Sequence, residues 1–361
     1  MSCFLILKGL CEEIEGMIRN FWWGQRKEEK KIAWVSWEKM CKAKSNGGMG
    51  FRNFQAFNLA MLVKQGCRLL SNPDSLCAKF FKARYYSSGD ILNSKLGCSP
   101  SYTWRSIFKG LDVVRNGSHW RVGKGRLIHI WEDKWLPTPT TYKVISPPRP
   151  FDDFPMVSAL IDEDTERWKV DTLKSLFLPF EVETILNIPL SHNLPEDKII
   201  WVGNKMGDFS VKSAYYVALF MINSSDRGEC SYRDPRTPLW KRIWLFKIPS
   251  KIRIFSWKAY VNALPTMSNL RKRGVSTDGL CPVCGLEDET ILHALCSCSA
   301  VKEVWRLWKD CPISFGVKSL DFSDVATKVL ATGNLKDLEI LFVVEWAIWH
   351  NRNLRVFDSV C

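Results

Sequence analysis

The sequence lacks a segment that would take it into or across a membrane. A spanning helix needs about 18 or more consecutive apolar residues. The nearest candidate, LEILFVVEWAIW at 338–349, is shorter and contains Glu339 and Glu345. The N-terminal apolar run breaks at Lys8 and then turns acidic, unlike a secretory signal peptide. We therefore expect an intracellular protein, nuclear or cytoplasmic and not secreted, with no membrane partner.

Histidine is scarce, and the cysteines are odd in number. The chain has 5 histidines and 13 cysteines. A disulfide framework needs paired cysteines and an oxidising compartment, so the clustered cysteines of this sequence favour metal binding instead. With so few histidines, the sequence offers no second cluster of metal ligands outside residues 281–298.

The sequence also lacks the carboxylate clusters of metal-dependent polymerases and nucleases. Such enzymes hold their catalytic metal ions with several converging carboxylates. The one Asp-Asp pair, Asp152-Asp153, lies among prolines in RPFDDFP (149–155) without flanking apolar strands, which is typical of a solvated loop. No glycine-rich phosphate-binding loop occurs, since Gly123-Lys124-Gly125 has the composition of a turn. We expect no catalytic residue, no small-molecule substrate and no enzymatic activity in this chain.

Acidic residues are absent from 236–275, although this segment contains ten of the chain's Lys and Arg residues and the net charge is +13. Such a region attracts polyanions and releases their counterions, although a merely solvated basic surface is the alternative. Aromatic residues lie among the cations, as in grooves that follow a nucleic-acid backbone, but Phe255 and Trp257 are more typical of a core. We expect RNA or DNA to bind mainly through phosphates with weak sequence preference. The candidate residues are Lys241, Arg242, Lys247, Lys251, Arg253, Lys258, Arg271, Lys272 and Arg273. A second candidate surface comprises Lys64, Arg68, Lys79, Lys82, Arg84, Arg121, Lys124 and Arg126.

The segment CPVCGLEDETILHALCSC (281–298) has the spacing of a zinc site. Cys281 and Cys284 form a Cys-x-x-Cys turn, and His293 and Cys298 follow at x8 and x4. We expect Asp288 to cap a helix that begins near residue 289 and directs His293 toward the turn. Three thiolates and one imidazole close a tetrahedral site without a position for an activating water, which indicates one structural Zn²⁺.

A redox pair and inert buried cysteines are the alternative interpretations of this segment. A redox Cys-x-x-Cys normally follows a strand of a thioredoxin-like fold, and none is predicted here. The spacing leaves Cys296 as a possible replacement for Cys298, but we expect Cys296 to pack as a small apolar residue.

Apolar periodicity predicts a largely helical protein. Apolar residues at three- and four-residue steps are typical of amphipathic helices, and alternating residues around glycine turns predict hairpins at 119–135 and 198–211. The predicted fold class is α+β, mainly α-helical: helical bundles, two short antiparallel β ribbons and a small zinc-binding helical module. The expected helices lie at 3–22, 54–71, 74–86, 101–114, three times within 239–274, at 300–310 and at 337–350.

Composition divides the chain into five predicted parts. The clearest linker is the proline-rich stretch 138–155. The expected parts are a helical region with a β-hairpin (1–137), a proline-containing linker and acidic segment (138–197), a hairpin, helix and flexible loop (198–235), a zinc-binding domain (236–312) and a C-terminal helical tail (313–361).

Taken together, these motifs resemble the C-terminal region of plant non-LTR (LINE-type) retroelement polyproteins. PLWKRIWLFKIPSKIRIFSWKAYVNALPT, LRKRG and CPVCGLEDETILHALCSCSAVKEVW are similar to their reverse-transcriptase zinc-binding domain. FWWG (21–24), segment 37–70 and WRVGKGRLIHIWEDKWLP (120–137) resemble the region between the polymerase palm and that domain. AIWHNRN (347–353) resembles the approach to a ribonuclease H domain. The resemblance covers nearly the whole chain.

The resemblance implies that Cys281, Cys284, His293 and Cys298 are the zinc ligands and that this region holds template or target nucleic acid between two catalytic modules. It also implies a non-catalytic, retroelement-derived fragment that lacks the palm and stops at Cys361, where the ribonuclease H domain would begin. Two alternatives stay open. The chain could be a truncated part of an active reverse transcriptase and ribonuclease H polyprotein, or its zinc module could bind protein.

Overall fold

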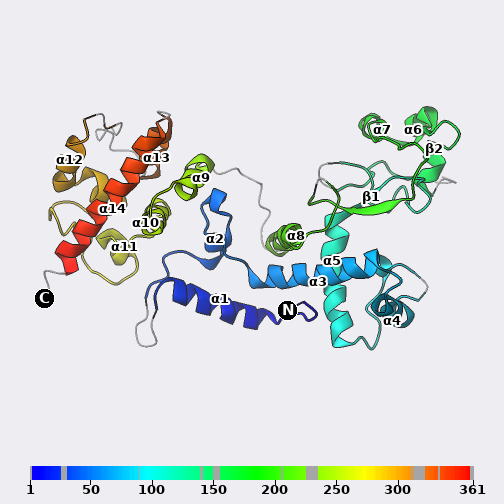
Figure 1. The fold of residues 1–361 in the computed structure, drawn as a ribbon, viewed down its shortest axis with the longest axis horizontal. Helices are drawn as coiled ribbons and strands as arrows, with labels where there is room; N and C mark the ends of the chain where they lie inside the picture. Colours follow the sequence, from blue (N-terminus) through cyan, green and yellow to red (C-terminus); the bar gives the residue numbers. More distant parts are fainter. Residues whose placement is uncertain are drawn as a thin grey trace. The chain divides into compact units, whose positions relative to one another are not determined.

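The described part of the chain divides into two compact units. In the computed structural model, unit 1 consists of Met1–Glu12 and Phe54–Glu229, and unit 2 consists of Glu13–Asn53 and Cys230–Cys361 (Figure 1). The structure describes residues 2–25, 31–87, 89–138, 141–148, 155–204, 206–224, 235–309, 311, 322–331 and 334–357.

Three packed helices form the centre of unit 1: α3 (Phe54–Ser71), α5 (Tyr102–Gly117) and α8 (Val211–Ser224). α3 and α5 approach closely because Gly110 on α5 has no side chain; an added Cβ would lie 3.0 Å from the backbone carbonyl carbon of Leu62. Apolar side chains of all three helices form one buried core.

The first sheet of unit 1 pairs strands that are distant in sequence. β1 (Ser118–Arg121) runs antiparallel to β4 (Lys198–Trp201). The hairpins predicted within 119–135 and 198–211 are therefore wrong, although each contributes one strand to this sheet. The reason is Asp197, whose carboxylate accepts hydrogen bonds from the N–H groups of Gly123 and Gly125 at 2.8 Å. The glycine loop thus wraps around the residue that precedes β4 and holds β4 beside β1.

The second ribbon lies in a segment where no strand was predicted. β2 (Ile161–Asp162) pairs antiparallel with β3 (Arg167–Trp168). Two helices follow, α6 (Val170–Leu176) and α7 (Pro179–Leu186), and the segment has its own buried cluster of apolar residues. The predicted fold class, mainly helical with two short antiparallel ribbons, is confirmed.

The core of unit 2 is formed by several helices and by a short segment near the N-terminus. Its main elements are α9 (Thr237–Leu245), α10 (Ser250–Tyr260) and α14 (Leu335–Phe357). Trp257 is fully buried and donates its indole N–H to the carbonyl oxygen of Gly47, at 3.0 Å. Phe255 and Trp257 were predicted to lie in the core, and the structure confirms this.

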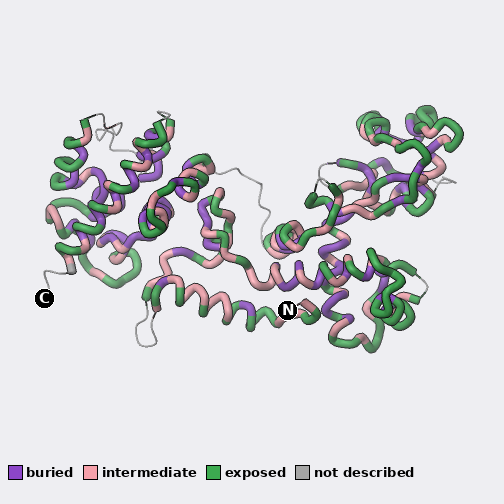
Figure 2. The backbone as a smooth tube through the Cα atoms, in the orientation of Figure 1, coloured by how far each residue is buried: buried purple, intermediate pink, exposed green. Residues whose placement is uncertain are grey.

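The helices predicted from periodicity are all present, with ends shifted by a few residues. α1 (Lys8–Trp22) is half-buried or exposed along its length apart from Cys11 (Figure 2). The other confirmed helices are α3, α4 (Leu76–Tyr85), α5, α8, α9, α10, α11 (Met267–Lys272), α12 (Ser299–Arg306) and α14. The helical elements not predicted are α2 (Trp37–Cys41), α6, α7, α13 (Phe322–Ala331) and the 3-10 turns Lys44–Asn46, Ile91–Asn93 and Val157–Leu160. Within the described ranges, no helix combines the length and apolar composition that crossing a bilayer requires.

Candidate metal centre

Four predicted ligands meet at one point in unit 2. One ligand atom each from Cys281, Cys284, His293 and Cys298 lies within 4.8 Å of every other. Zn–S bonds of about 2.3 Å and Zn–N bonds of about 2.0 Å place tetrahedral ligand atoms roughly 3.5–3.8 Å apart, so small side-chain adjustments suffice to hold one ion. The donor set of three sulfurs and one imidazole nitrogen is that of a structural zinc site. Cys281, His293 and Cys298 are buried, as a closed site requires.

The Cys-x-x-Cys turn prepares its sulfurs for a cation with backbone N–H groups. Gly285 donates its N–H to the carbonyl oxygen of Cys281 at 2.8 Å and has a φ of 68°, which favours glycine. The N–H groups of Leu286 and Glu287 point at the Cys284 sulfur. The Leu286 N–H has the largest effect, and together with the Glu287 N–H and the contacts to His293 and Cys281 it lowers the pKa of Cys284 to about 6. Burial raises the pKa of the Cys281 thiol to about 11. A metal ion supplies the positive charge that offsets this burial.

His293 is oriented by a partner on each side of its ring. Its Nε2 lies 3.4 Å from the sulfur of Cys284, while its Nδ1 lies 3.1 Å from the carboxylate of Glu287. This arrangement assigns the proton to Nδ1 and leaves Nε2 as the metal ligand, as in carboxylate–histidine–zinc arrangements. The role of Glu287 was not predicted, because one acidic residue among three in LEDE gives no signal by itself.

Thr290, and not Asp288, caps the turn that carries His293. The Thr290 hydroxyl accepts the N–H of His293 at 3.1 Å. The prediction of an Asp288 cap was therefore wrong. Asp288 instead pairs with the guanidinium of Arg271, with Arg271 Nη2 2.6 Å from Asp288 Oδ2. Its backbone forms an antiparallel bridge with Leu280, which closes the metal loop.

The turn between His293 and Cys298 is one residue wider than an α-helical turn. The segment His293–Ser297 is π-helical, and the N–H of Cys298 donates to the carbonyl oxygen of His293 at 2.9 Å. A five-residue step brings residue 298 back above residue 293, so the imidazole and the thiol face the same point. Cys296 lies outside the cluster, is buried in the core and has its pKa raised by burial, which confirms that it packs as an apolar residue.

A buried ion pair lies behind the metal loop. Glu289 is fully buried and accepts two hydrogen bonds from Arg352 of α14, Nε to Oε1 at 2.8 Å and Nη2 to Oε2 at 2.6 Å. Glu289 also accepts the N–H of Met267, the first residue of α11, at 2.7 Å. This carboxylate therefore links the metal loop, α11 and α14. Sequence reasoning missed the pair because its members are far apart in the chain.

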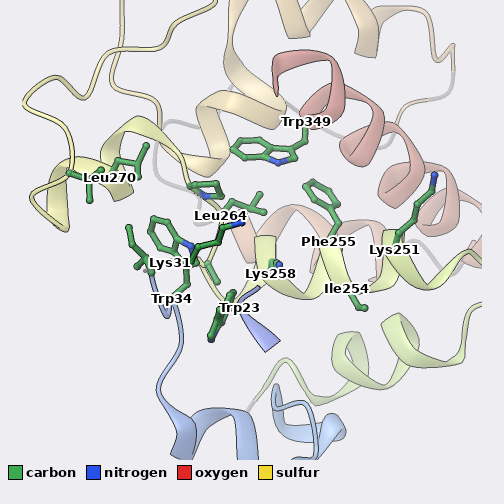
Figure 3. A pocket seen from close by; sticks show the side chains of 14 residues that line it. Trp23, Lys31, Trp34, Lys251, Ile254, Phe255, Lys258, Leu264, Leu270 and Trp349 are labelled. Atoms are coloured by element: carbon green, nitrogen blue, oxygen red, sulfur yellow. The ribbon is translucent and has the colours of Figure 1, made fainter. Parts of the chain in front are cut away.

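The predicted basic residues line more than one pocket. Lys251 and Lys258 of α10 line the same pocket (Figure 3), whereas Lys272 lines a different one with Lys39 and Arg236. The second candidate surface is partly neutralised, because Lys79, Lys124 and Arg126 pair with carboxylates. The exposed members of the first set are Lys241, Lys247, Lys251, Arg271, Lys272 and Arg273, and the half-buried members are Arg242, Arg253 and Lys258.

The Asp152-Asp153 pair lies outside the described residues. Within the ranges that the structure does describe, the Cys3His group is the one cluster of three or more His, Cys, Asp or Glu side chains suited to a metal ion.

Comparison with known proteins shows that the segment containing this metal centre matches a known domain family. Residues 209–305, which include all four ligands, match the family described as zinc-binding in reverse transcriptase. The chain is 36% identical over 137 residues to the "Uncharacterized mitochondrial protein AtMg00310" of Arabidopsis thaliana, covering 38% of this chain and 89% of that protein. The chain belongs to the same family as this relative.

A longer relative extends the similarity over most of the chain. The "Putative ribonuclease H protein At1g65750" of Arabidopsis thaliana is 28% identical over 312 residues, covering 84% of this chain. The chain spans about half the length of that relative, 48%. No solved structure matches the chain.

Proposed function

We propose that this chain is a retroelement-derived, non-catalytic module of an intracellular polyprotein, of the plant non-LTR type, and that it binds RNA or DNA through phosphate contacts. One observation supports the proposal. Of the nine candidate cations in 241–273, Arg271 is the one that has an ion pair with a carboxylate of the described residues. Cations held on a fold without acidic partners attract polyanions and release their counterions.

The zinc ion has a structural role in this proposal. All four positions of a tetrahedral ion are taken by protein, so no water is activated and the ion supplies folding free energy instead. A bound ion would fix residues 279–298. Through the contacts of Asp288 with Arg271 and of Glu289 with Met267, it would also hold the basic helix α11 in place.

A truncated piece of an active reverse transcriptase and ribonuclease H polyprotein is the enzyme alternative. The name of the longer relative favours this alternative, and the catalytic residues would then lie outside the 361 residues of this chain. Genomic sequence on both sides of the reading frame distinguishes the two, because intact palm and ribonuclease H codons support the enzyme alternative and their absence supports the non-catalytic module.

The experiment that tests phosphate binding replaces exposed lysines that form no ion pair with the described residues. Lys241, Lys247 and Lys272 are exposed, and the triple alanine variant should lower affinity for all single strands alike. Each phosphate contact to a single strand releases about 0.7 counterions. Losing three contacts should therefore flatten the slope of log affinity against log salt concentration by about 2. Arg271→Ala is unsuitable because its partner Asp288 belongs to the metal loop.

The matched control removes the same charge elsewhere. Lys174, Lys198 and Lys212 of unit 1 are exposed as well, and their triple alanine variant should retain the wild-type slope. Filter binding across a salt series measures both variants. Equal slopes for the two variants contradict a phosphate site in 241–272, and binding of protein ligands that polyanions do not displace would favour the protein-binding alternative.

A further inference from the structure

A pocket of about 660 Å³ lies at the corner of unit 1 where α3 ends and α4 begins (Figure 1). Its lining comes from the last turns of α3, the loop 72–75, the first turn of α4 and Ile107 of α5, all within the described part of the chain. Gln65 and Asn72 contribute side-chain amides, and Leu69 and Ile107 are buried apolar members of the lining. Ligand pockets commonly combine an apolar lining with a few polar groups in this way, at volumes of about 300–1,000 Å³.

The charge around this pocket is mainly positive. Arg68 lines it, and Lys64 lies one turn earlier on α3, so both project from the same face of the helix. Both are exposed, and neither forms an ion pair with a carboxylate of the described residues. The one carboxylate among the lining residues, that of Asp74, lies 3.7 Å from the ammonium of Lys79 on α4. A polyanion would supply the partner that Lys64 and Arg68 lack.

The outer face of α4 continues this surface. The helix buries Ala78 and Phe81 and exposes most of its other residues (Figure 2). Phe80 is 59% exposed and lies edge-on to Phe81, with the ring centres 5.8 Å apart. The helix contains three cations and no acidic residue, and Lys82 and Arg84 form no ion pair with a carboxylate of the described residues. An accessible ring among cations is typical of surfaces that bind single strands.

We propose that this corner of unit 1 binds a single-stranded nucleic acid. One base stacks on Phe80, and a neighbouring nucleotide occupies the pocket, where the amides of Gln65 and Asn72 can hydrogen-bond to it. Arg68 and Lys82 hold the phosphates. Phe80 lies one turn of α4 beyond Cys77, which lines the pocket, so one strand can reach both. The proposal rests on the proposed function and adds to it a contact site in unit 1 and a preference for single strands.

The chemistry of this surface favours a single strand over other occupants. A duplex keeps its bases stacked inside, so it cannot place one on Phe80 without opening. An acidic peptide would satisfy the cations but would stack on Phe80 only where it has an aromatic residue. A helix that lies in a membrane surface buries a broad apolar face, whereas the exposed large apolar side chains of α4 are Leu76 and Phe80.

Cys77 reports directly on the occupancy of the pocket. It lines the pocket and is exposed, so a maleimide can alkylate it in the folded full chain. Cys3 and Cys98 are also exposed but do not line the pocket, and they serve as internal controls. Mass spectrometry measures the alkylation rate of each thiol with and without a saturating single-stranded oligonucleotide, prepared as RNA and as DNA. We expect at least one of the two strands to slow alkylation of Cys77 several-fold and to leave the rates of Cys3 and Cys98 unchanged.

Phe80→Ala tests the stacking contact. It should weaken binding of the single strand roughly tenfold, the loss expected for one base stacked on an aromatic ring. Binding of a duplex, and of the same strand with abasic positions in its centre, should hardly change. Phe80→Tyr keeps the aromatic face and should restore most of the affinity. Phe180→Ala removes another exposed phenylalanine of unit 1, on α7, and should bind like the wild type. Thermal stability is measured for each variant, so a misfolded protein is recognised.

The outcomes distinguish this inference from the proposed function. If single strands bind but Cys77 keeps its alkylation rate and Phe80→Ala has no effect, this site is rejected while phosphate binding elsewhere stands. If no nucleic acid binds at low salt, both are overturned. If an acidic peptide or anionic lipid vesicles protect Cys77 and single strands do not, the surface binds another partner and the proposal is rejected.

Discussion

Arg352 and Glu289 form a bidentate ion pair inside the core of unit 2, with Arg352 Nη2 2.6 Å from Glu289 Oε2. Glu289 lies between the second and third zinc ligands in sequence, and Arg352 lies near the end of α14. The C-terminal helix and the metal loop are therefore stabilised as one structure.

Removing one partner of this pair should destabilise unit 2 strongly. Arg352→Met leaves the Glu289 carboxylate buried without a cation, which costs about 3–5 kcal/mol. Urea unfolding, monitored by the release of zinc, should show this loss of stability as a lower urea concentration at the midpoint. The control is Lys336→Ala, which removes an exposed cation of the same helix and should have little effect. The double variant Arg352→Met, Glu289→Leu should recover much of the stability, because no charge is left buried; no recovery would mean that the pair acts in another way.

The four ligands should bind one zinc ion per chain. Cys281→Ser, His293→Ala and Cys298→Ser should each release the ion and unfold the metal loop, because binding free energy is folding free energy at such sites. Elemental analysis of the purified variants measures the stoichiometry. Cys296→Ala is the control and should retain zinc, since its sulfur lies outside the cluster. Zinc retained by Cys298→Ser but lost by Cys296→Ala would reverse the ligand assignment.

Glu287 should raise the zinc affinity without touching the ion. Its carboxylate accepts the Nδ1 proton of His293 and makes Nε2 a better donor. Glu287→Gln is expected to lower the affinity about 10–100-fold, measured by competition with a chromophoric chelator. Glu303→Gln removes an exposed carboxylate of α12 and should leave the affinity unchanged. Equal affinities for both variants would show that the Glu287 contact is incidental.

Glu345 should make the stability of unit 2 fall as pH rises. Burial raises the pKa of Glu345 from 4.5 to about 8, and Tyr260 donates its hydroxyl to this carboxyl group at 2.9 Å. The folded state therefore keeps its proton over a range in which the unfolded state has lost it. Stability should decrease between pH 4.5 and about 8 and then become constant with respect to this group.

The neutral variant isolates this effect from other titrating groups. Glu345→Gln keeps an acceptor for Tyr260 and should be more stable than the wild type by an amount that grows up to about pH 8. Melting temperatures measured from pH 6 to 9 test this. Glu339→Gln, on the same helix, should give no such trend, and parallel curves for wild type and Glu345→Gln would contradict the prediction.

Local patterns in the sequence predicted the features that depend on neighbouring residues. The bounds 54–71 were predicted and are those of α3, because its apolar stripe is uninterrupted. The zinc ligands were predicted because they lie close together in sequence, at spacings that let all four ligand atoms reach one ion. The cap of the metal turn was wrong because Asp288 and Thr290 are both good capping residues, and tertiary contact with Arg271 decides between them.

Features that depend on distant residues could not be predicted in this way. The strand that β1 pairs with is determined by Asp197, whose carboxylate takes the N–H groups of a loop more than 70 positions earlier. An isolated aspartate gives no sign of such a role. The Glu289–Arg352 pair is hidden for the same reason, since its members are 63 positions apart.

The wide turn between His293 and Cys298 makes the metal centre sensitive to chain length. The one residue beyond the i+4 step of an α-helix is accommodated by the π-helical hydrogen bond from the Cys298 N–H to the His293 carbonyl oxygen. An insertion among positions 294–297 would need a still wider turn to bring the thiol back toward His293, whereas a single deletion would leave the i+4 spacing at which an α-helix places two side chains on one face. Over evolutionary time, insertions at these four positions should therefore be rejected more often than single deletions.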